Sequence, residues 1–337
     1  MPDARSGPVT IADVAAAAGV SLGTVSKAMN GRGRMRPETR QRVQAVAAQM
    51  GYQPNVSARA LQGGSSYTVG ILSTDRIGRF SIPIMSGAEH TLGAGEMSVF
   101  LCDARDDQIR EQYYLRTLLS RRVDGIIVTG RRTDERPSIS AAVPVPVVYA
   151  FIRSDDPADT SVVPDERLGV ELALSHLLAT GRRSIGHITG PRHHHSALLR
   201  ATESAAFLAE RGGLALVTEP FFGEWSEAWG RNAAERLLAA APETDAIFCG
   251  SDQVARGVVQ GLQRIGKSVP GDVAVVGFDN WDVMALGCQP PLTTLDMDLE
   301  GLGRRAAEQL LRAIGGTPAP GVQLHPPQLV IRESTVS

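Results

Sequence analysis

The sequence contains few cysteines and no long hydrophobic run. Three cysteines occur in 337 residues, and their odd number and wide spacing favour neither a disulfide framework nor a zinc site. No apolar stretch approaches the ~20 residues that cross a membrane, and the first ten residues lack the apolar core of a secretory signal. We therefore expect a cytoplasmic protein that does not contact the membrane.

The sequence gives little support to an enzyme. Gly31 and Gly33 are not followed by the third glycine of a dinucleotide-binding loop, and we expect neither a phosphate loop nor a Gly-x-Ser-x-Gly nucleophile turn. The run from His193 to His195 could indicate a metal, but consecutive side chains on a loop rarely converge on one ion, and a loop at a cleft mouth is the favoured alternative. No catalytic residue, metal or cofactor is predicted.

Charge is unevenly distributed along the chain. Residues 1–62 contain eight Lys or Arg and three Asp or Glu, so this segment carries a net charge of +5. The whole chain carries −2, which leaves −7 for the remainder. A basic segment on an acidic body favours a polyanion partner for the segment, although charge alone would fit a solvated basic face equally well.

The N-terminal segment begins with the pattern of two short helices. Thr10 can cap the first helix in a capping box with Asp13, and Gly19 allows a tight turn after it. Ser21 can then cap a second helix that runs to about Met29. The buried face of the first helix would comprise Ile11, Val14, Ala15 and Ala18, and the outward residues of the second would be Leu22, Gly23, Ser26 and Lys27. An outward face near the start of a second helix is where a helix-turn-helix protein contacts base edges.

A third helix and a short segment follow. Pro37 suits the first position of the third helix, which Gly51 closes. The segment 54–61 starts with Pro54 and is stopped by glycines, and it is too short to be stably helical alone. It is therefore either a plain linker or a helix that forms only under some conditions.

These residues resemble the headpiece of the LacI/GalR family of bacterial repressors. The matching runs are Val9–Ser21, Thr24–Gly31 and Thr39–Asn55. The resemblance implies that Leu61 is an apolar wedge, which two paired hinge helices insert into the minor groove. The DNA-contacting residues that it implies are Thr10, Ser21, Leu22, Gly23, Thr24, Ser26, Lys27, Asn30, Arg36, Asn55, Arg59 and Leu61.

Four of these positions carry distinct expectations. Lys27 could donate to guanine or contact a phosphate, and Leu22 could contact a thymine methyl or pack internally. Gly23 replaces the polar residue usual in the family and offers no side chain for base recognition. At the position of Arg36 the family commonly has a small hydroxyl residue that caps the third helix. An arginine there would give up this cap and could contact a phosphate instead.

From Tyr67 onward, short β-branched stretches alternate with amphipathic ones, which predicts parallel sheets covered by helices on both faces. The expected strands are 68–72, 98–102, 125–129, 145–149, 184–189, 214–217, 246–249 and 273–277. Helices expected between them include 107–121, 167–180, 252–265 and 299–314. Two such lobes would hold a ligand in the cleft between them, at the carboxyl ends of the strands.

The family resemblance extends over this body and implies a periplasmic-binding-protein-like fold of two doubly wound parallel-sheet lobes after an all-α helix-turn-helix headpiece. Its markers are 121–128, 251–252, 269–279, 290–294 and 329–335. The expected domains are a headpiece at 1–53, a hinge helix and linker at 54–66, one lobe at 67–164 plus 292–321, and the other at 165–291 plus 322–337. Without a C-terminal heptad helix, a homodimer is implied.

The resemblance also implies an effector site, formed by Phe80, Thr129, Phe151, Arg200, Trp225, Ser251 and Asp279. Arg200 would grip polar groups of the ligand, with a surface salt bridge as the alternative. Trp225 would stack on a sugar or purine, with an ordinary core tryptophan as the alternative. Asp279 can accept from two hydroxyls, whereas Phe151 replaces an aspartate and Ser251 an asparagine common in the family.

Together these features predict a sequence-specific transcriptional regulator, a repressor of carbohydrate-utilisation genes, that binds a near-palindromic operator as a dimer. A small-molecule effector, a sugar or a derivative, would change the lobe angle and the spacing of the two hinges. The sequence does not determine whether the effector releases the DNA or promotes its binding, because both kinds of control would use the same headpiece, hinge and cleft. The body alone would also fit an extracytoplasmic sugar-binding protein, but the basic headpiece argues against that class.

Overall fold

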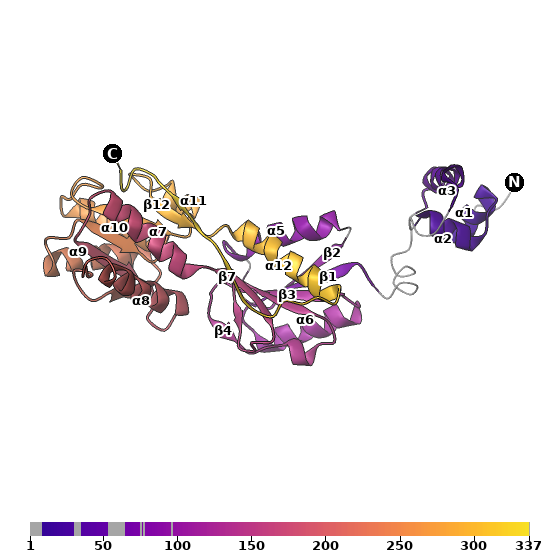
Figure 1. Cartoon of the computed structure of the whole chain (residues 1–337), viewed down its shortest axis with the longest axis horizontal. Coiled ribbons are helices and arrows are strands. Elements are labelled where there is room, and N and C mark those ends of the chain that lie inside the picture. Colours follow the sequence, from indigo (N-terminus) through magenta and orange to yellow (C-terminus); the bar gives the residue numbers. More distant parts are fainter. Residues whose placement is uncertain are drawn as a thin grey trace. The chain divides into compact units, whose positions relative to one another are not determined.

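The computed structural model describes residues 9–29, 35–52, 65–74, 76, 78–95 and 97–336. The chain divides between Tyr67 and Thr68 into two compact units (Figure 1). The first is a helical headpiece, and the second is an α/β body with two sheets.

The headpiece consists of α1 (Ile11–Ala18), α2 (Leu22–Met29) and α3 (Pro37–Gln49). These bounds are those that the caps and the apolar spacing predict. The three helices enclose a small core, whose buried members are Val14, Ala15, Ala18, Val25, Ala28, Val43 and Ala47. Because small residues fill this core, three short helices can pack closely with few apolar side chains.

The first lobe of the body is built on a parallel sheet with the strand order β13-β7-β5-β3-β1-β2. Its strands are β1 (Thr68–Ser73), β2 (Ser98–Asp103), β3 (Gly125–Thr129), β5 (Val147–Ala150), β7 (Thr160–Pro164) and β13 (Gly321–His325). Helices α5 (Ser81–Ala94) and α12 (Leu299–Ile314) pack on one another, and α6 (Gln108–Ser120) contacts β1 and β2. Two short strands, β4 (Glu135–Arg136) and β6 (Arg153–Ser154), and the 3₁₀ turn Ser140–Ala142 complete this lobe.

Glycines allow α5 and α12 to approach until their backbones touch. A Cβ atom at Gly87 of α5 would lie 2.0 Å from the carbonyl oxygen of Glu300, and one at Gly303 of α12 would lie 2.0 Å from that of Ile84. Neither position can therefore hold a larger residue without separating the two helices. The pair covers the sheet as one layer.

The second lobe has the strand order β14-β12-β11-β10-β8-β9, in which only β14 is antiparallel. Its strands are β8 (Ile185–Thr189), β9 (Phe221–Phe222), β10 (Ala246–Cys249), β11 (Ala274–Phe278), β12 (Thr293–Asp296) and β14 (Gln328–Val330). Its helices are α7 (Glu166–Ala179), α8 (His195–Ala209), α9 (Glu227–Ala240), α10 (Asp252–Arg264) and the short α11 (Asp282–Ala285). Helices α7 and α8 pack as one pair, and α9 and α10 as another.

The chain passes between the lobes three times: from β7 to α7, from β12 to α12, and from β13 to β14 (Figure 1). The last two crossings differ from those expected at residues 292 and 322. Strand β12 still pairs with β11 in the second lobe, and β13 pairs with β7 in the first. The chain therefore crosses after Asp296 and returns after His325, because the turn at Pro290 and Pro291 precedes a further strand of the second sheet.

Seven of the eight expected strands correspond to strands of the structure, with ends shifted by at most two residues. The expected strand 214–217 is wrong. Leu214 and Leu216 pack against the core without joining a ladder, and the strand in this region is β9. Their alternating pattern therefore reflects packing, not strand pairing.

Candidate functional site

The start of α1 contains the predicted capping box. The backbone N–H of Thr10 donates to Asp13 Oδ2 (2.8 Å), and the backbone N–H of Asp13 donates to Thr10 Oγ1 (3.4 Å). Gly19 then adopts φ of 64°, the left-handed conformation that a glycine turn allows. The capping box thus marks where α1 begins, and Gly19 ends it and allows the turn toward α2.

Helix α2 presents one face to solvent, from its first residue to its last turn. Leu22 is 53% exposed, and Gly23 and Lys27 are exposed as well, while Val25 and Ala28 are buried against the other helices. The backbone N–H of Thr24 donates to Ser21 Oγ (3.2 Å), so Ser21 caps the helix as predicted. The free N–H groups at the start of α2 and the charge of Lys27 in its last turn are both positive, so this exposed surface is suited to a polyanion.

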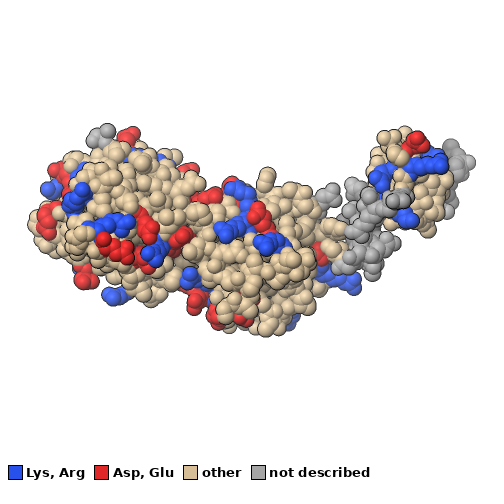
Figure 2. Space-filling model, in the orientation of Figure 1, with Lys and Arg blue, Asp and Glu red and all other residues tan. Residues whose placement is uncertain are grey.

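Positive charge continues onto α3. Arg36 precedes Pro37, the first residue of the helix, and makes no side-chain capping bond. Its exposed guanidinium is thus available to solvent at the position where the sequence predicts a phosphate contact. Figure 2 shows blue basic side chains over much of the visible face of the headpiece. Four residues predicted to contact DNA, Asn30, Asn55, Arg59 and Leu61, lie outside the described residues.

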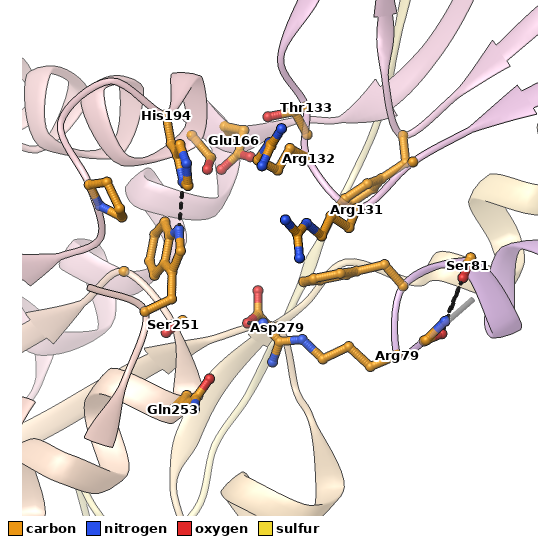
Figure 3. A pocket seen from close by; sticks show the side chains of 18 of the residues that line it. Arg79, Ser81, Arg131, Arg132, Thr133, Glu166, His194, Ser251, Gln253 and Asp279 are labelled. Carbon is orange, nitrogen blue, oxygen red and sulfur yellow. Dashed lines mark hydrogen bonds and ion pairs between the residues drawn. The ribbon is translucent and has the colours of Figure 1, made fainter. Parts of the chain in front are cut away.

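The body contains a cavity of about 650 Å³ to which both lobes contribute (Figure 3). This volume lies within the ~300–1,000 Å³ of small-molecule sites. The cavity opens at the carboxyl ends of β1 and β3 in the first lobe and of β8, β10 and β11 in the second. Its lining includes Arg76, Arg79, Phe80, Ser81, Arg131, Arg132, Thr133, Phe151, Glu166, His193, His194, Arg200, Glu224, Trp225, Ser251, Gln253 and Asp279.

Six of the seven predicted effector residues line this cavity. Phe80 and Phe151 stack on each other with ring centroids 5.0 Å apart, forming one apolar wall. Ser251 lines the cavity and also caps α10, because its Oγ accepts from the backbone N–H of Val254 (3.2 Å). Thr129 is not among the lining residues; it is fully buried at the end of β3.

Arg79 and Asp279 form an ion pair between the lobes. Arg79 Nη2 lies 2.9 Å from Asp279 Oδ2, and the guanidinium lies over the rings of Phe80 and Trp281 at 4.3 and 4.5 Å. Asp279 follows β11 and has φ of 112°, a conformation uncommon for a residue other than glycine. Burial raises the pKa of Asp279, and the charge of Arg79 opposes this shift.

A second carboxylate lies behind Asp279. Burial, and then the charge of Asp279, raise the pKa of Asp252 to about 8. Asp252 accepts from Thr294 Oγ1 (2.5 Å) and from the backbone N–H of Trp281 (2.7 Å). It does not line the cavity, so we assign it to the support of the loop that carries Asp279.

Arg200 is buried and bonded to the protein itself. Its Nε lies 2.5 Å from Glu166 Oε2, its Nη1 donates to the carbonyl oxygen of Gly250, and its guanidinium lies 3.5 Å above the ring of Phe278. The side chains of Arg200 and Glu166 are only 5% and 4% exposed. The predicted arginine therefore reaches the cavity, but in an internal ion pair.

Trp225 and the histidine loop form the opposite wall. Trp225 Nε1 donates to His194 Nδ1 (2.8 Å), and burial lowers the pKa of His194, which favours the neutral ring that can accept this bond. The indole ring lies against Gly190, where a Cβ atom would be 2.1 Å from Trp225 Cε2. Gly190 thus provides the space that sets the plane of the indole.

A contact between the lobes also holds the histidine loop. The backbone N–H of His195, at the start of α8, donates to Asp134 Oδ1 (2.8 Å), and Asp134 Oδ2 lies 2.9 Å from Arg132 Nε. Asp134 belongs to the first lobe and α8 to the second. The carboxylate and the helix start attract each other, so the contact favours closure of the cavity at this edge.

Several functional candidates were not singled out from the sequence: Arg79, Arg131, Arg132, Thr133 and Glu166. Arg131 to Thr133 follow β3 directly, and the carboxyl end of that strand was the available signal. Glu166 begins α7 directly after the first crossing between the lobes. A rule that residues at crossings face the cleft would have identified it.

Two stretches match enzyme motifs by spacing, contrary to expectation. Gly261 to Ser268 has the spacing of a phosphate loop, but it begins inside α10 instead of after a strand, and both the N–H and the hydroxyl of Ser268 donate to Asp272. Gly19 to Gly23 has the spacing of a nucleophile turn, but it connects α1 to α2. Neither has the context that its chemistry requires.

Within the described part of the chain, no group of three His, Cys, Asp or Glu residues is placed to hold a metal ion. In the same part, none of the helices combines the length and the apolar character needed to cross a membrane.

Comparisons with known proteins agree with this division of the chain. Residues 10–55 match the model of bacterial regulatory proteins of the lacI family, and residues 174–335 match that of a periplasmic binding protein-like domain. Catabolite control protein A of Priestia megaterium is 30% identical, over 97% of this chain and 99% of its own length. HTH-type transcriptional regulator DegA of Bacillus subtilis is 32% identical, over 97% and 98%, and the ribose operon repressor of Escherichia coli 31%, over 90% and 93%.

Solved structures lead to the same family. The lac repressor dimer bound to operator and the anti-inducer ONPF superposes with a TM-score of 0.78 at 27% identity, covering 98% of this chain and all of that one. The complex of the transcriptional regulator CelR with cellobiose has a TM-score of 0.66 at 28% identity, covering 97% and 99%. The chain belongs to the lacI family of bacterial regulatory proteins, and it is a DNA-binding transcriptional repressor, not an enzyme.

Proposed function

We propose that the protein acts in the cytoplasm as a homodimer that binds a near-palindromic operator, and that a small molecule in the cavity of the body controls this binding. The observation that carries the proposal is the cavity itself. Both lobes line it, and the Arg79–Asp279 pair bridges it, so a ligand there must change the contacts between the lobes. Coupling of this kind typically changes an affinity by ~1–3 kcal/mol.

The geometry of α2 supports operator recognition. Leu22 at the start of α2 and Lys27 in its last turn are both exposed, so the apolar side chain can contact a thymine methyl and the lysine can contact guanine or a phosphate. Gly23, between them, adds no side chain and leaves open space above the backbone. We therefore expect base recognition to depend more on the flanking residues than on this position.

Exposed apolar side chains on the body support the homodimer. They are Ile82 of α5, Phe100 and Leu101 of β2, and Val283 and Leu286 at α11. Figure 1 shows α5 and α11 on the same upper side of the body, one in each lobe. A second copy that covered this side would contact both lobes and would sense the angle between them.

The nature of the cavity supports a sugar or sugar derivative as the effector, and genes of carbohydrate use as the target. Aromatic walls formed by Phe80, Phe151 and Trp225 stand beside the carboxylates of Glu166 and Asp279. Such a combination suits a molecule with apolar faces and hydroxyl edges. One relative is a ribose operon repressor and another was solved with cellobiose.

The operator claim is tested by gel shift against the upstream region of the protein's own gene, over a salt series. We expect tighter binding to this region than to random DNA of the same length. Leu61→Ala should weaken binding to this region and spare binding to random DNA, if Leu61 is a minor-groove wedge. Equal affinity for both DNAs would exclude sequence-specific control at this site.

The effector claim is tested by a thermal-shift screen of neutral sugars, polyols, sugar phosphates, sugar acids and nucleobases. A compound that raises the Tm should also change the operator affinity in the gel shift. If no compound of the panel raises the Tm, the cavity is not a site for these classes. If one raises the Tm without altering operator binding, the proposed control is wrong.

A further inference from the structure

Two buried polar atoms that line the cavity, one in each lobe, have no hydrogen-bond partner among the described residues. They are Thr133 Oγ1 in the loop after β3 and Glu166 Oε1 at the start of α7. Thr133 is 3% exposed and Glu166 4%. A buried polar group without a partner is unfavourable, and such groups in native proteins are few. Figure 3 draws the two residues at the same end of the cavity.

The surroundings of Glu166 explain why one of its oxygens has no partner. Arg200 Nε binds Oε2, and the remaining contacts of Arg200 go to Gly250 and Phe278. Arg200 is held on three sides, so it fixes the carboxylate of a residue that lines the cavity, and Oε1 is left without a partner in the described chain. In this geometry Arg200 is a positioning residue, and Glu166 is the group that a ligand can reach.

The chemistry of the two atoms defines the group that they can bind. Glu166 Oε1 accepts only, so it requires a donor. Thr133 Oγ1 can donate or accept. An alcohol serves both, whereas a carboxylate or a fully ionised phosphate would meet the negative charge of Glu166 without a proton to donate. Two further lining residues of the described chain carry buried polar atoms that lack a hydrogen bond: Arg79 Nη1, which donates only, and Asp279 Oδ2, which lies 2.9 Å from Arg79 Nη2 in the ion pair.

We infer that Thr133 and Glu166 bind hydroxyl groups of the effector from opposite lobes, and that this pair selects a hydroxylated ligand end over an acidic one. The inference rests on the proposal that the cavity is the effector site. Because the two residues belong to different lobes, a hydroxylated ligand would connect them and stabilise the closed arrangement.

Thr133→Val separates this role from a structural one, because the two predict opposite changes. Valine has nearly the shape of threonine and removes a hydroxyl that has no protein partner. The ligand-free variant should therefore have an equal or higher Tm than the wild type, while its affinity for the neutral sugar or polyol that gives the largest thermal shift falls by a factor of ten or more. Thr133→Ser should restore most of this affinity.

The matched control is Thr189→Val. Thr189 is fully buried, its Oγ1 also lacks a partner within the described chain, and it does not line the cavity. This variant should gain stability in the same way but keep the affinity of the wild type. An equal loss of affinity in both variants would overturn the inference, since the effect would then come from packing.

Glu166→Gln tests the acceptor. The glutamine oxygen would face Arg200 and its amide NH₂ would face the cavity, which replaces an acceptor by a donor. Isothermal titration would measure the affinity of the wild type and the variant for the neutral probe and for analogues that each lack one hydroxyl. We expect the wild type to lose affinity when the hydroxyl that Glu166 binds is missing, and the variant to bind the probe and that one analogue about equally. Glu171→Gln on the same helix, whose partner is the exposed Arg167, should leave that preference intact.

The outcomes distinguish the inference from the proposal on which it rests. If only sugar phosphates or sugar acids bind and control the operator, the proposed function stands and the inference is wrong. If neutral sugars bind but Thr133→Val and Glu166→Gln keep the wild-type affinity and preference, the inference is again wrong. If no class binds, the effector proposal itself fails.

Discussion

Replacing Arg79 by methionine should destabilise the body in a pH-dependent way. The charge on Arg79 Nη2 lies 2.9 Å from Asp279 Oδ2, and the two side chains are 24% and 6% exposed. With an effective dielectric constant of about 20, the gross attraction is about 6 kcal/mol. Desolvation of the pair offsets much of it, and the partial exposure of Arg79 screens it further, so the net loss should be about 2–3 kcal/mol. Methionine keeps an unbranched apolar stem at this position but removes the guanidinium that lies over Phe80 and Trp281.

The sign of the pH dependence follows from Asp279. Burial raises its pKa above the ordinary value, and Arg79 opposes the shift, so the variant should have a higher Asp279 pKa than the wild type. An ionised, buried Asp279 without Arg79 is unfavourable, whereas a protonated Asp279 no longer requires it. The difference in stability should therefore be largest at alkaline pH and shrink as the pH falls.

Calorimetry of the wild type and the variant at pH 8 and pH 5 measures this effect. For a domain of this size, 2–3 kcal/mol corresponds to a fall in Tm of about 4–5 °C, expected at pH 8. The control is Arg167→Met, which removes an exposed partner of Glu171 and should change the Tm by less than about 2 °C. The reasoning is refuted if both variants lose the same stability, or if the loss from Arg79→Met is the same at both pH values.

Three further predictions concern other parts of the chain. Asp159→Asn should cost about 2–4 kcal/mol in urea unfolding at pH 7, because Ser138, Ser140 and Ser154 all donate to this carboxylate. Burial alone would raise the pKa of Asp159, but these hydrogen bonds outweigh it and lower the pKa. The stability that Asp159 contributes is therefore present above pH ~4 and is lost as the pH falls below that value. An equal loss of stability in the variant at pH 7 and at pH 3 would contradict this. Lys27→Gln should weaken operator binding. If the slope of log affinity against log salt concentration falls by about one, Lys27 contacts a phosphate; if the preference for one base pair is relaxed, it contacts guanine. Gly190→Ala should displace Trp225 and abolish the ligand-induced thermal shift, whereas Gly212→Ala, in an open turn, should leave the shift intact. An intact shift in Gly190→Ala would show that Trp225 does not contact the ligand.

The headpiece could be predicted from sequence almost to the residue, because its helices begin and end at local signals. Thr10, Gly19 and Pro37 act within one turn of their own position, and no distant contact competes with them. The short strands β7 and β12 were missed, since each is flanked on one side by a strand that joins the sheet later in the chain, β13 beside β7 and β14 beside β12. The strand predicted at 214–217 was wrong for the opposite reason. Its alternating apolar residues, Leu214 and Leu216, pack against the core without pairing as a strand.

The cavity was predicted in outline but not in its charges. Family resemblance placed Phe80, Phe151 and Trp225 on its walls, and the structure has them there. It also assigned Arg200 to the ligand, whereas the structure pairs it with Glu166. A sequence shows which side chains can ionise, but which of them neutralise one another depends on contacts made only after two lobes have formed.

The three crossings between the lobes also determine when each lobe can be completed during synthesis. The first lobe needs α12 and β13, and the second needs β14 together with the end at Ser334, whose N–H donates to Pro291 O and whose hydroxyl donates to Val275 O. Neither sheet is therefore complete until the ribosome has made more than nine-tenths of the chain. A transcript broken before β13 would yield a protein with two unfinished sheets, whereas one broken between β13 and β14 would leave only the second sheet unfinished. Premature stop codons close to the end should therefore join a headpiece that has its own core to an incomplete body.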